Sequence, residues 1–281
     1  MNRRLLCAIL ALCLLVPLAA CGAESTPAVM AATKPIYDLT AALAEGTEIP
    51  VRCILSEPVS CLHDYTLSVT QMRALEGAPL ILRNGLGLDD FLNDAIPQGA
   101  VCADLSAGIA LLPGEDGADP HIWLDPDCAA VMAENACAAL TQVYPEKKDR
   151  LEENLASLLA KLDALKQEGA AQLASLSCRK LITFHDGFAY FARAYSLALL
   201  ASMEEEHGSE IAASDLAEIV HLVQENRLPA IFTEAYGSDA AAKTVQRETG
   251  TQVFALDLGM GDREYFSAMR YNFETLKEAL G

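Results

Sequence analysis

Basic residues are scarce in this 281-residue chain, which has 20 Lys and Arg against 39 Asp and Glu and a formal net charge of −19. Residues 1–20 contain Arg3 and Arg4 but no acid, so their removal takes the net charge to −21. This balance argues against nucleic acid and anionic membrane surfaces as partners. It is compatible with steering of cations toward the protein, and equally with an acidic surface that only keeps the chain soluble.

Several short catalytic and metal-binding motifs are also missing. The chain has no H-E-x-x-H sequence and no G-x-S-x-G elbow, which are the signatures of zinc proteases and serine hydrolases. None of its cysteines forms a C-x-x-C metal pair. Apolar residues, in contrast, make up 52% of the chain. That is ample for a large core, and the length is more typical of two lobes than of one.

Residues 1–20 form a targeting segment that we exclude from the fold. Arg3 and Arg4 give a basic start, and the apolar run 5–15 is too short to span a bilayer comfortably. The sequence L-A-A-C that ends at Cys21 resembles a bacterial lipobox. That resemblance implies cleavage before Cys21, a diacylglyceryl thioether on its sulfur and a short tether over residues 21–27. The alternative is an ordinary secretory signal that ends at Ala20.

Six cysteines remain in the exported part of the chain, and the sequence alone does not give their pairing. Cys61 lies two residues before a histidine, where a disulfide or a buried thiol is more probable than a metal ligand. Cys128 and Cys137 are nine residues apart on one predicted helix, so they should not bridge each other. The six are Cys53, Cys61, Cys102, Cys128, Cys137 and Cys178.

Strand and helix patterns alternate along the chain. The alternation predicts an α/β protein with two similar parallel-sheet lobes that face each other across a cleft. The predicted strands are 29–33, 51–55, 80–83, 101–104, 180–184, 198–202, 230–233 and 253–256. The predicted helices outside the middle of the chain are 36–44, 69–76, 88–95, 126 to 144, 186–195, 215–226, 240–249 and 265–280.

The middle of the chain has a different pattern. Leucines recur at helical spacing after Pro145, with charged residues between them. They predict one helix of about 28 residues, roughly 40 Å long at 1.5 Å per residue. A helix of this length leaves the first lobe, so we expect a stiff connector that packs against both lobes. The expected divisions are an N-terminal lobe at 28–145, a connecting helix at 146–176 and a C-terminal lobe at 177–281.

One histidine stands in a stiff frame, the stretch A-D-P-H-I-W-L-D-P at residues 118–126. Pro120 fixes its own backbone angle just before His121. Asp125 followed by Pro126 predicts a helix start, with the carboxylate as N-cap and proline at the first helical position. His121 is therefore held at a loop-to-helix junction. A lone histidine there is more often a local hydrogen-bonding residue than a ligand, so it needs partners.

Two more histidines share this setting. His63 follows a candidate strand and a proline-containing loop, and His185 ends the apolar run L-I-T-F. Open α/β sheets bind ligands at the carboxyl ends of their strands, so the three histidines should meet in the cleft. His207 lies in the acidic segment E-E-E-H-G-S-E, where a solvated loop competes with a weak auxiliary site. His221 should face solvent from an amphipathic helix.

The ordered set of motifs resembles the zinc and manganese solute-binding lipoproteins of bacterial ABC importers, over essentially the whole chain. The matching stretches are S-C-L-H-D-Y-T-L-S, N-G-L-G-L-D-D-F-L, D-P-H-I-W-L-D-P, T-F-H-D-G-F-A-Y-F-A-R-A-Y, I-F-T-E and A-L-D-L-G. The resemblance implies a metal held between two lobes by His63, His121, His185 and Asp257. Two features depart from the family pattern: Cys61 and Leu62 before His63, and the absence of a long histidine-rich loop before His121.

The donor types favour zinc without reference to the family. Three neutral imidazoles and one carboxylate suit a tetrahedral d¹⁰ ion, whereas calcium and magnesium need oxygen-rich sites. Manganese is the second choice, because it binds such a site more weakly than zinc. Asp257 and Glu234 both end apolar strands, and we assign Asp257 to the metal and Glu234 to the orientation of an imidazole. Helix capping accounts for Asp125 and Asp186.

Two functions of different classes follow. The favoured one is a non-enzymatic binding protein, anchored through Cys21 to the outer face of the cell membrane, that captures Zn²⁺ and delivers it to an ABC permease driven by an ATPase. We expect it to be a monomer. The alternative is a secreted zinc hydrolase, in which three protein ligands and a water complete the metal site. A fourth protein ligand would close the position that such a water needs.

Overall fold

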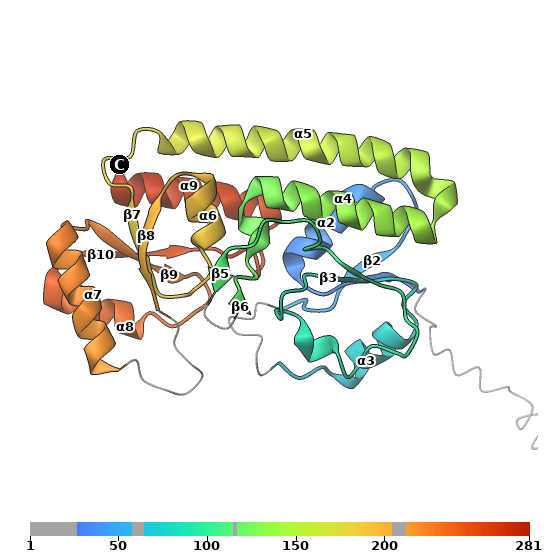
Figure 1. The fold of residues 1–281 in the computed structure, drawn as a ribbon, viewed down its shortest axis with the longest axis horizontal. Coiled ribbons are helices and arrows are strands. Elements are labelled where there is room, and N and C mark those ends of the chain that lie inside the picture. The colour runs from blue at the N-terminus through green and yellow to red at the C-terminus, as the bar shows by residue number, and fades with distance from the viewer. Residues whose placement is uncertain (1–26, 58–64, 115–116, 204–211) are drawn as a thin grey trace, which may run out of the picture.

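The computed structural model describes the chain from residue 27 to residue 281, except for 58–64, 115–116 and 204–211. Within these residues the strands form two four-stranded sheets and one short antiparallel pair. Every pairing within the two larger sheets is parallel. Figure 1 shows one sheet in each half of the molecule, with helices packed around it. The predicted class, α/β with two parallel-sheet lobes, is confirmed.

The N-terminal sheet has the strand order β2-β1-β3-β4. Its central strands are fully buried at Val29, Ala31, Ile81 and Leu82, as expected for parallel strands with helices on both faces. The antiparallel pair β5-β6 and the turn η3 lead from this sheet to the next long helix. The elements are β1 (Val29–Ala31), α2 (Lys34–Ala44), β2 (Val51–Cys53), α3 (Val69–Glu76), β3 (Ile81–Arg83), η2 (Asp90–Leu92), β4 (Cys102–Asp104), β5 (Pro113–Gly114), β6 (Gly117–Ala118), η3 (Ile122–Leu124) and α4 (Pro126–Val143).

The C-terminal sheet has the strand order β10-β9-β7-β8. All five residues of β9 are buried, including Glu234 at its carboxyl end. Because the strands are parallel, their carboxyl ends meet at one edge of the sheet. The elements are β7 (Lys180–Thr183), α6 (Ala189–Ala194), β8 (Ala198–Ser202), α7 (Ala213–Asn226), β9 (Ala230–Glu234), α8 (Ala240–Thr249), β10 (Gln252–Leu256) and α9 (Tyr265–Leu280).

A short turn, η4 (Pro145–Lys147), leads into α5 (Lys148–Leu173), a helix of 26 residues that joins the two lobes. Its buried face carries Leu151, Leu158, Leu162 and Leu165. This face packs against α2 and α4 of the N-terminal half and against α9 at the end of the chain. Figure 1 shows α5 lying along these helices over most of the length of the molecule. The predicted connecting helix is confirmed.

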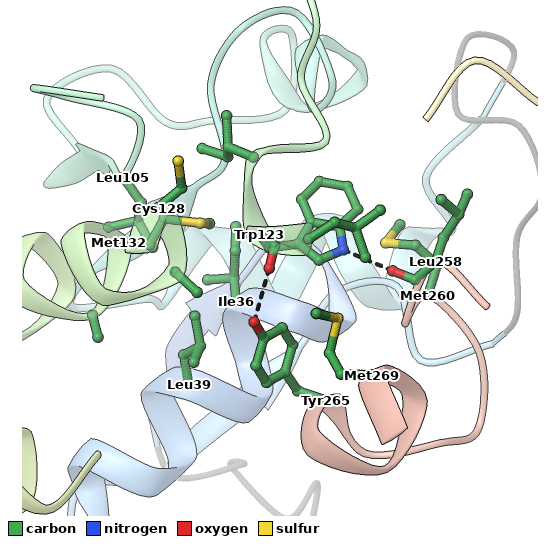
Figure 2. Packing of buried hydrophobic residues seen from close by; sticks show 14 of the residues in the cluster. Ile36, Leu39, Leu105, Trp123, Cys128, Met132, Leu258, Met260, Tyr265 and Met269 are labelled. Atoms are coloured by element: carbon green, nitrogen blue, oxygen red, sulfur yellow. Dashed lines mark hydrogen bonds between the residues drawn. The ribbon is translucent and has the colours of Figure 1, made fainter. Parts of the chain in front are cut away.

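One hydrophobic core cluster spans both lobes, and Trp123 is fully buried within it. A second, smaller cluster, which includes Ile182, Ile219 and Val245, lies within the C-terminal lobe. Trp123 Nε1 donates to the Leu258 carbonyl at 2.7 Å, and the Trp123 carbonyl accepts from Tyr265 Oη at 2.8 Å (Figure 2). The backbone N–H of Tyr265, in turn, donates to Asp38 of α2. Relative motion of the lobes is therefore restricted on this side, because separation would break buried hydrogen bonds.

Two predicted helices differ in the structure. The segment predicted as the helix 88–95 contains only the short 3₁₀ turn η2, and Gly85, Leu86 and Gly87 before it have left-handed backbones. The helix predicted to start at Asp186 starts at Ala189 and has no side-chain cap. Asp186 does not cap it, because its carboxylate accepts from Ser202 Oγ of β8 at 2.9 Å. The N-cap prediction for Asp125 is confirmed.

The cysteine predictions can be checked in part. Cys61 lies outside the described residues. The other five exported cysteines are free thiols, so no disulfide joins any two of them. Cys128 and Cys137 both lie on α4 and do not bridge, as predicted. A membrane span needs a long helix of high hydropathy, and the described part of the chain contains none.

Candidate metal centre

His121 follows β6 and directly precedes η3, with 9% of its surface exposed. The Asp119 carboxylate fixes it twice: Oδ1 accepts from the His121 backbone N–H at 2.9 Å and lies 2.8 Å from Nδ1. An ionised carboxylate only accepts hydrogen bonds, so Nδ1 carries the proton in this pair. The other ring nitrogen, Nε2, then presents a lone pair.

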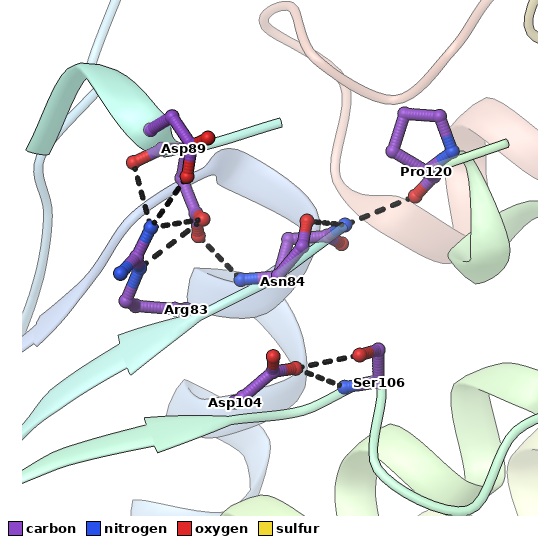
Figure 3. A network of polar contacts seen from close by, with 8 residues as sticks. Arg83, Asn84, Asp89, Asp104, Ser106 and Pro120 are labelled. Atoms are coloured by element: carbon purple, nitrogen blue, oxygen red, sulfur yellow. Dashed lines mark hydrogen bonds and ion pairs between the residues drawn. The ribbon is translucent and has the colours of Figure 1, made fainter. Parts of the chain in front are cut away.

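A polar network of β3 and the loop after it contacts Pro120, the residue before His121 (Figure 3). The Asn84 side-chain amide donates to the Pro120 carbonyl at 3.0 Å. The Asn84 backbone N–H donates to Asp89, which is fully buried and also pairs with Arg83 at 3.1 Å. Pro120 is therefore fixed by its own ring and by the end of a neighbouring strand, and the position of the next residue, His121, is set by both.

His185 follows β7 in the other lobe. Thr183 Oγ1 donates to the His185 carbonyl at 3.0 Å. On the imidazole, Nδ1 lies 3.6 Å from Oε2 of Glu234, a buried residue at the end of the adjacent strand β9. Burial, and then the nearby His121 ring, lowers the pKa of His185 to about 3. The folded protein therefore holds this imidazole in its neutral form, which is the form that binds metals.

The two imidazoles meet between the lobes. His121 Nε2 and His185 Nε2 are 3.3 Å apart, and the ring planes are inclined by 87°. Two nitrogen ligands at about 2.0–2.1 Å from a tetrahedral ion would be about 3.3–3.4 Å apart. The two residues thus fit a zinc-sized ion, because each ring has a carboxylate beside Nδ1 and directs Nε2 to a common point.

The other predicted site residues are placed as follows. His63, His207 and Cys21 lie outside the described residues, so their roles stay predictions. His221 has 75% of its side chain exposed, which confirms that it faces solvent. Within the described part of the chain, no three His, Cys, Asp or Glu side chains form a group that could hold a metal.

Asp257 lies at the carboxyl end of β10 and is fully buried. Its Oδ1 accepts from the Gly259 N–H at 2.7 Å, and its Oδ2 accepts from Arg263 Nη1 at 2.7 Å. Its backbone is held by two hydrogen bonds with the Asn272 side chain. Both carboxylate oxygens therefore have partners in this structure, and the assignment of Asp257 to the metal stays a prediction.

Arg193 of α6 ties the two lobes together beside His121. Its guanidinium donates to Asp125 Oδ2, at 2.8 Å from Nη2 and 3.2 Å from Nε. One turn earlier on the same helix, Tyr190 Oη accepts from the Leu112 N–H at 2.9 Å. These contacts lie on either side of His121 in the sequence, so α6 holds both flanks of the segment that carries it.

Sequence reasoning missed three of these residues. Asp119 stands two positions before His121, and that spacing was a usable signal for a side chain that turns back on the ring. Arg193 and Arg263 left no such signal, because their partners come from another lobe or from the far side of a loop. Only the folded chain brings these charges together.

Known proteins are similar to this chain in both sequence and fold. The profile of the ZnuA family, described as the periplasmic component A of a zinc-uptake complex, matches residues 29–279. The zinc-binding lipoprotein AdcA of Streptococcus pneumoniae is 28% identical over 275 residues, which cover 87% of this chain and 54% of AdcA. The chain thus spans about half the length of that relative.

Two further proteins are similar to this chain, one in sequence and one in both sequence and structure. The iron-binding protein YfeA of Yersinia pestis is 26% identical over 243 residues, which cover 81% of this chain and 78% of YfeA. A crystal structure of ZnuA superposes with a TM-score of 0.80 at 28% identity, over 90% of this chain and 99% of that one. The similarity includes both lobes and the helix between them.

Proposed function

The chain belongs to the ZnuA family of periplasmic zinc-uptake components, and from this premise we propose that it captures Zn²⁺ outside the cytoplasmic membrane and delivers it to a membrane ABC permease. The observation that carries the proposal is the distance of 3.3 Å between His121 Nε2 and His185 Nε2, which come from different lobes. His185 follows β7 at the carboxyl edge of a parallel sheet, where this class of fold binds ligands, and His121 lies between the antiparallel pair β5-β6 and α4. The permease and the ATPase that drives it are the proposed partners, and the protein acts as a monomer.

We propose that His63 and Asp257 complete the set of ligands with His121 and His185. Four protein ligands would fill a tetrahedral zinc site and leave no position for a reactive water. Glu234, 3.6 Å from His185 Nδ1, would orient that ring through the nitrogen that does not bind the metal. This arrangement favours capture over hydrolysis, in agreement with relatives whose names describe metal-binding proteins.

The choice of ion rests on the donors. Three imidazoles and a carboxylate bind zinc more strongly than manganese or ferrous iron. Manganese is the second candidate, and the name of YfeA makes iron a third. Titration calorimetry of chelator-treated protein with Zn²⁺, Mn²⁺ and Fe²⁺ tests the order. We expect one tight zinc site per chain, and tighter binding of manganese or iron than of zinc would contradict the proposal.

The mechanism follows from a metal that cross-links two lobes. Zinc would join His121 of the N-terminal lobe to His185 and Asp257 of the C-terminal lobe. The shared core and α5 limit the lobes to a small tilt, so release requires the C-terminal ligands to loosen rather than the cleft to open widely. Zinc titration monitored by small-angle X-ray scattering should therefore show little change in the radius of gyration.

We propose that the protein is held at the outer face of the membrane by a lipid on Cys21. Mass spectrometry of the mature N-terminus would show a diacylated cysteine, and a Cys21→Ser variant would be released into the soluble fraction. A mature chain that begins at Cys21 without a lipid would contradict this anchor and leave the metal site unaffected.

A further inference from the structure

The buried carboxylate of Asp257 already has a cation beside it. Arg263 lies on the loop between β10 and α9, and its Nη1 is 2.7 Å from Asp257 Oδ2. The Asp257 side chain has no exposed surface, while that of Arg263 is 39% exposed. The guanidinium also lies over the Tyr271 ring, with 4.0 Å between its carbon and the ring centroid. The arginine thus reaches a buried anion from the outside of the protein.

The position of Asp257 does not depend on this arginine. Asn272 of α9 holds the Asp257 backbone through its N–H and its carbonyl, each at 2.7 Å. The Gly259 N–H fixes the second carboxylate oxygen. What Arg263 adds is charge, because a carboxylate removed from water needs a cation nearby.

We propose that Arg263 is an internal counter-ion that zinc displaces from Asp257, and that this exchange keeps zinc affinity low enough for release. The inference rests on the proposed function, in which Asp257 is a zinc ligand. A zinc ion and a guanidinium on one carboxylate would repel each other, so zinc binding must break the Arg263 contact or be weakened by it. After displacement, the guanidinium can keep its cation–π contact with the Tyr271 ring. When zinc leaves, the ion pair forms again and prevents an unpaired buried charge.

The test compares zinc binding in Arg263→Gln and in the unchanged protein, by chelator-competition titration and by stopped-flow transfer of zinc to a chelator. We expect the affinity of Arg263→Gln for zinc to rise about tenfold and its rate of zinc loss to fall by a similar factor. The melting temperature of its metal-free form should fall, because Asp257 is then buried without a counter-ion. Arg263→Lys, which keeps the charge, should behave much like the unchanged protein.

Arg270→Gln is the matched control. Arg270 lies on α9 and pairs with Glu168 of α5 rather than with Asp257. Arg270→Gln removes one positive charge, as Arg263→Gln does. It therefore measures the general electrostatic effect of that loss on the binding of a divalent cation. An equal gain of affinity in Arg270→Gln, or an unchanged or lower affinity in Arg263→Gln, would overturn the proposal.

The variant Asp257→Asn separates this inference from the proposed function. In that background Arg263→Gln should have no further effect on zinc affinity, because the two residues act through one contact. If Asp257→Asn binds zinc as tightly as the unchanged protein, Asp257 is not a ligand and the counter-ion role is wrong, while zinc capture by the histidines stands. If the unchanged protein binds no zinc, both proposals fail.

Discussion

The two imidazoles that face each other between the lobes are held by different contacts. His121 is fixed by a 2.8 Å contact from Nδ1 to Asp119 and by a network that reaches its neighbour Pro120. His185 has a longer contact of 3.6 Å to Glu234, and Thr183 bonds only to its backbone carbonyl. From these contacts we infer that the N-terminal lobe supplies the more rigid half of the candidate site and the C-terminal lobe the more adjustable half. Under the proposed function, such a site would keep its geometry for capture and let one half move for release.

The largest effect should come from removal of either imidazole. We expect His121→Ala and His185→Ala to weaken zinc binding by at least about a hundredfold, because each variant lacks one of the proposed metal ligands. Calorimetry measures the loss, and circular dichroism should show an unchanged fold. His221→Ala is the control, since that side chain is 75% exposed on α7. Unchanged zinc content in His121→Ala would refute the site.

The carboxylates beside the rings test the comparison directly. Asp119→Asn should lower zinc affinity by about 10- to 100-fold, because an amide no longer fixes the tautomer and direction of His121. Glu234→Gln should have the smaller effect, because its contact with His185 is longer. Zinc titrations of the two variants under the same conditions show which carboxylate contributes more to zinc affinity. If Glu234→Gln is the more damaging, the rigid half of the site lies in the C-terminal lobe.

The contact of Arg193 with Asp125, which joins the two lobes, should affect the stability of the protein more than its binding of zinc. Arg193→Gln loses the charged hydrogen bonds to Asp125, and we expect the free energy of unfolding to fall by about 1–2 kcal/mol in urea. Lys166→Gln is the control, because Lys166 pairs nearby with Asp127 at the exposed surface of α4. Equal losses of unfolding free energy in the two variants would mean that the contact between Arg193 and Asp125 stabilises the protein no more than a surface ion pair does.

The smallest effect we expect is a pH dependence of protein stability that comes from His185 in the adjustable half of the site. Unfolded His185 takes up a proton near its ordinary pKa of 6.5, whereas burial lowers the pKa of the folded residue to about 3. As the pH falls from 6.5 toward 3, the unfolded state binds a proton that the folded state does not, so stability falls. Urea unfolding of the metal-free protein should show this slope, and His185→Gln should flatten it. The same slope in both proteins would contradict the assignment, and His221→Gln provides the control.

The regular elements were largely predictable because their causes are local. The leucine spacing of α5 and the Asp-Pro start of α4 each act within a few residues, and both predictions are confirmed. The predicted helix 88–95 failed because the buried Asp89 side chain bonds back to Arg83 and Asn84. Such contacts join different elements, and no periodic pattern reveals them.

The candidate site was predictable only to the level of which loops meet. The rule that strand ends of parallel sheets converge was the basis for expecting His121 and His185 to meet. It applies to His185, which follows β7 of the parallel C-terminal sheet, whereas His121 follows β6 of the antiparallel pair and lies outside the rule. The direction of individual side chains was not available from the sequence. The pairings of Asp119 with His121 and of Arg263 with Asp257 depend on loop conformation, and loop conformation depends on the finished fold.

The single tryptophan of the chain has a practical consequence. The Trp123 indole lies 5.4 Å from the His121 ring, and its N–H is bonded to the residue that follows Asp257. Indole fluorescence responds to nearby charge and to hydrogen bonding, so arrival of a metal at the imidazoles should change the emission without any added label. Every binding and release step discussed above could then be followed in real time through light from one native side chain.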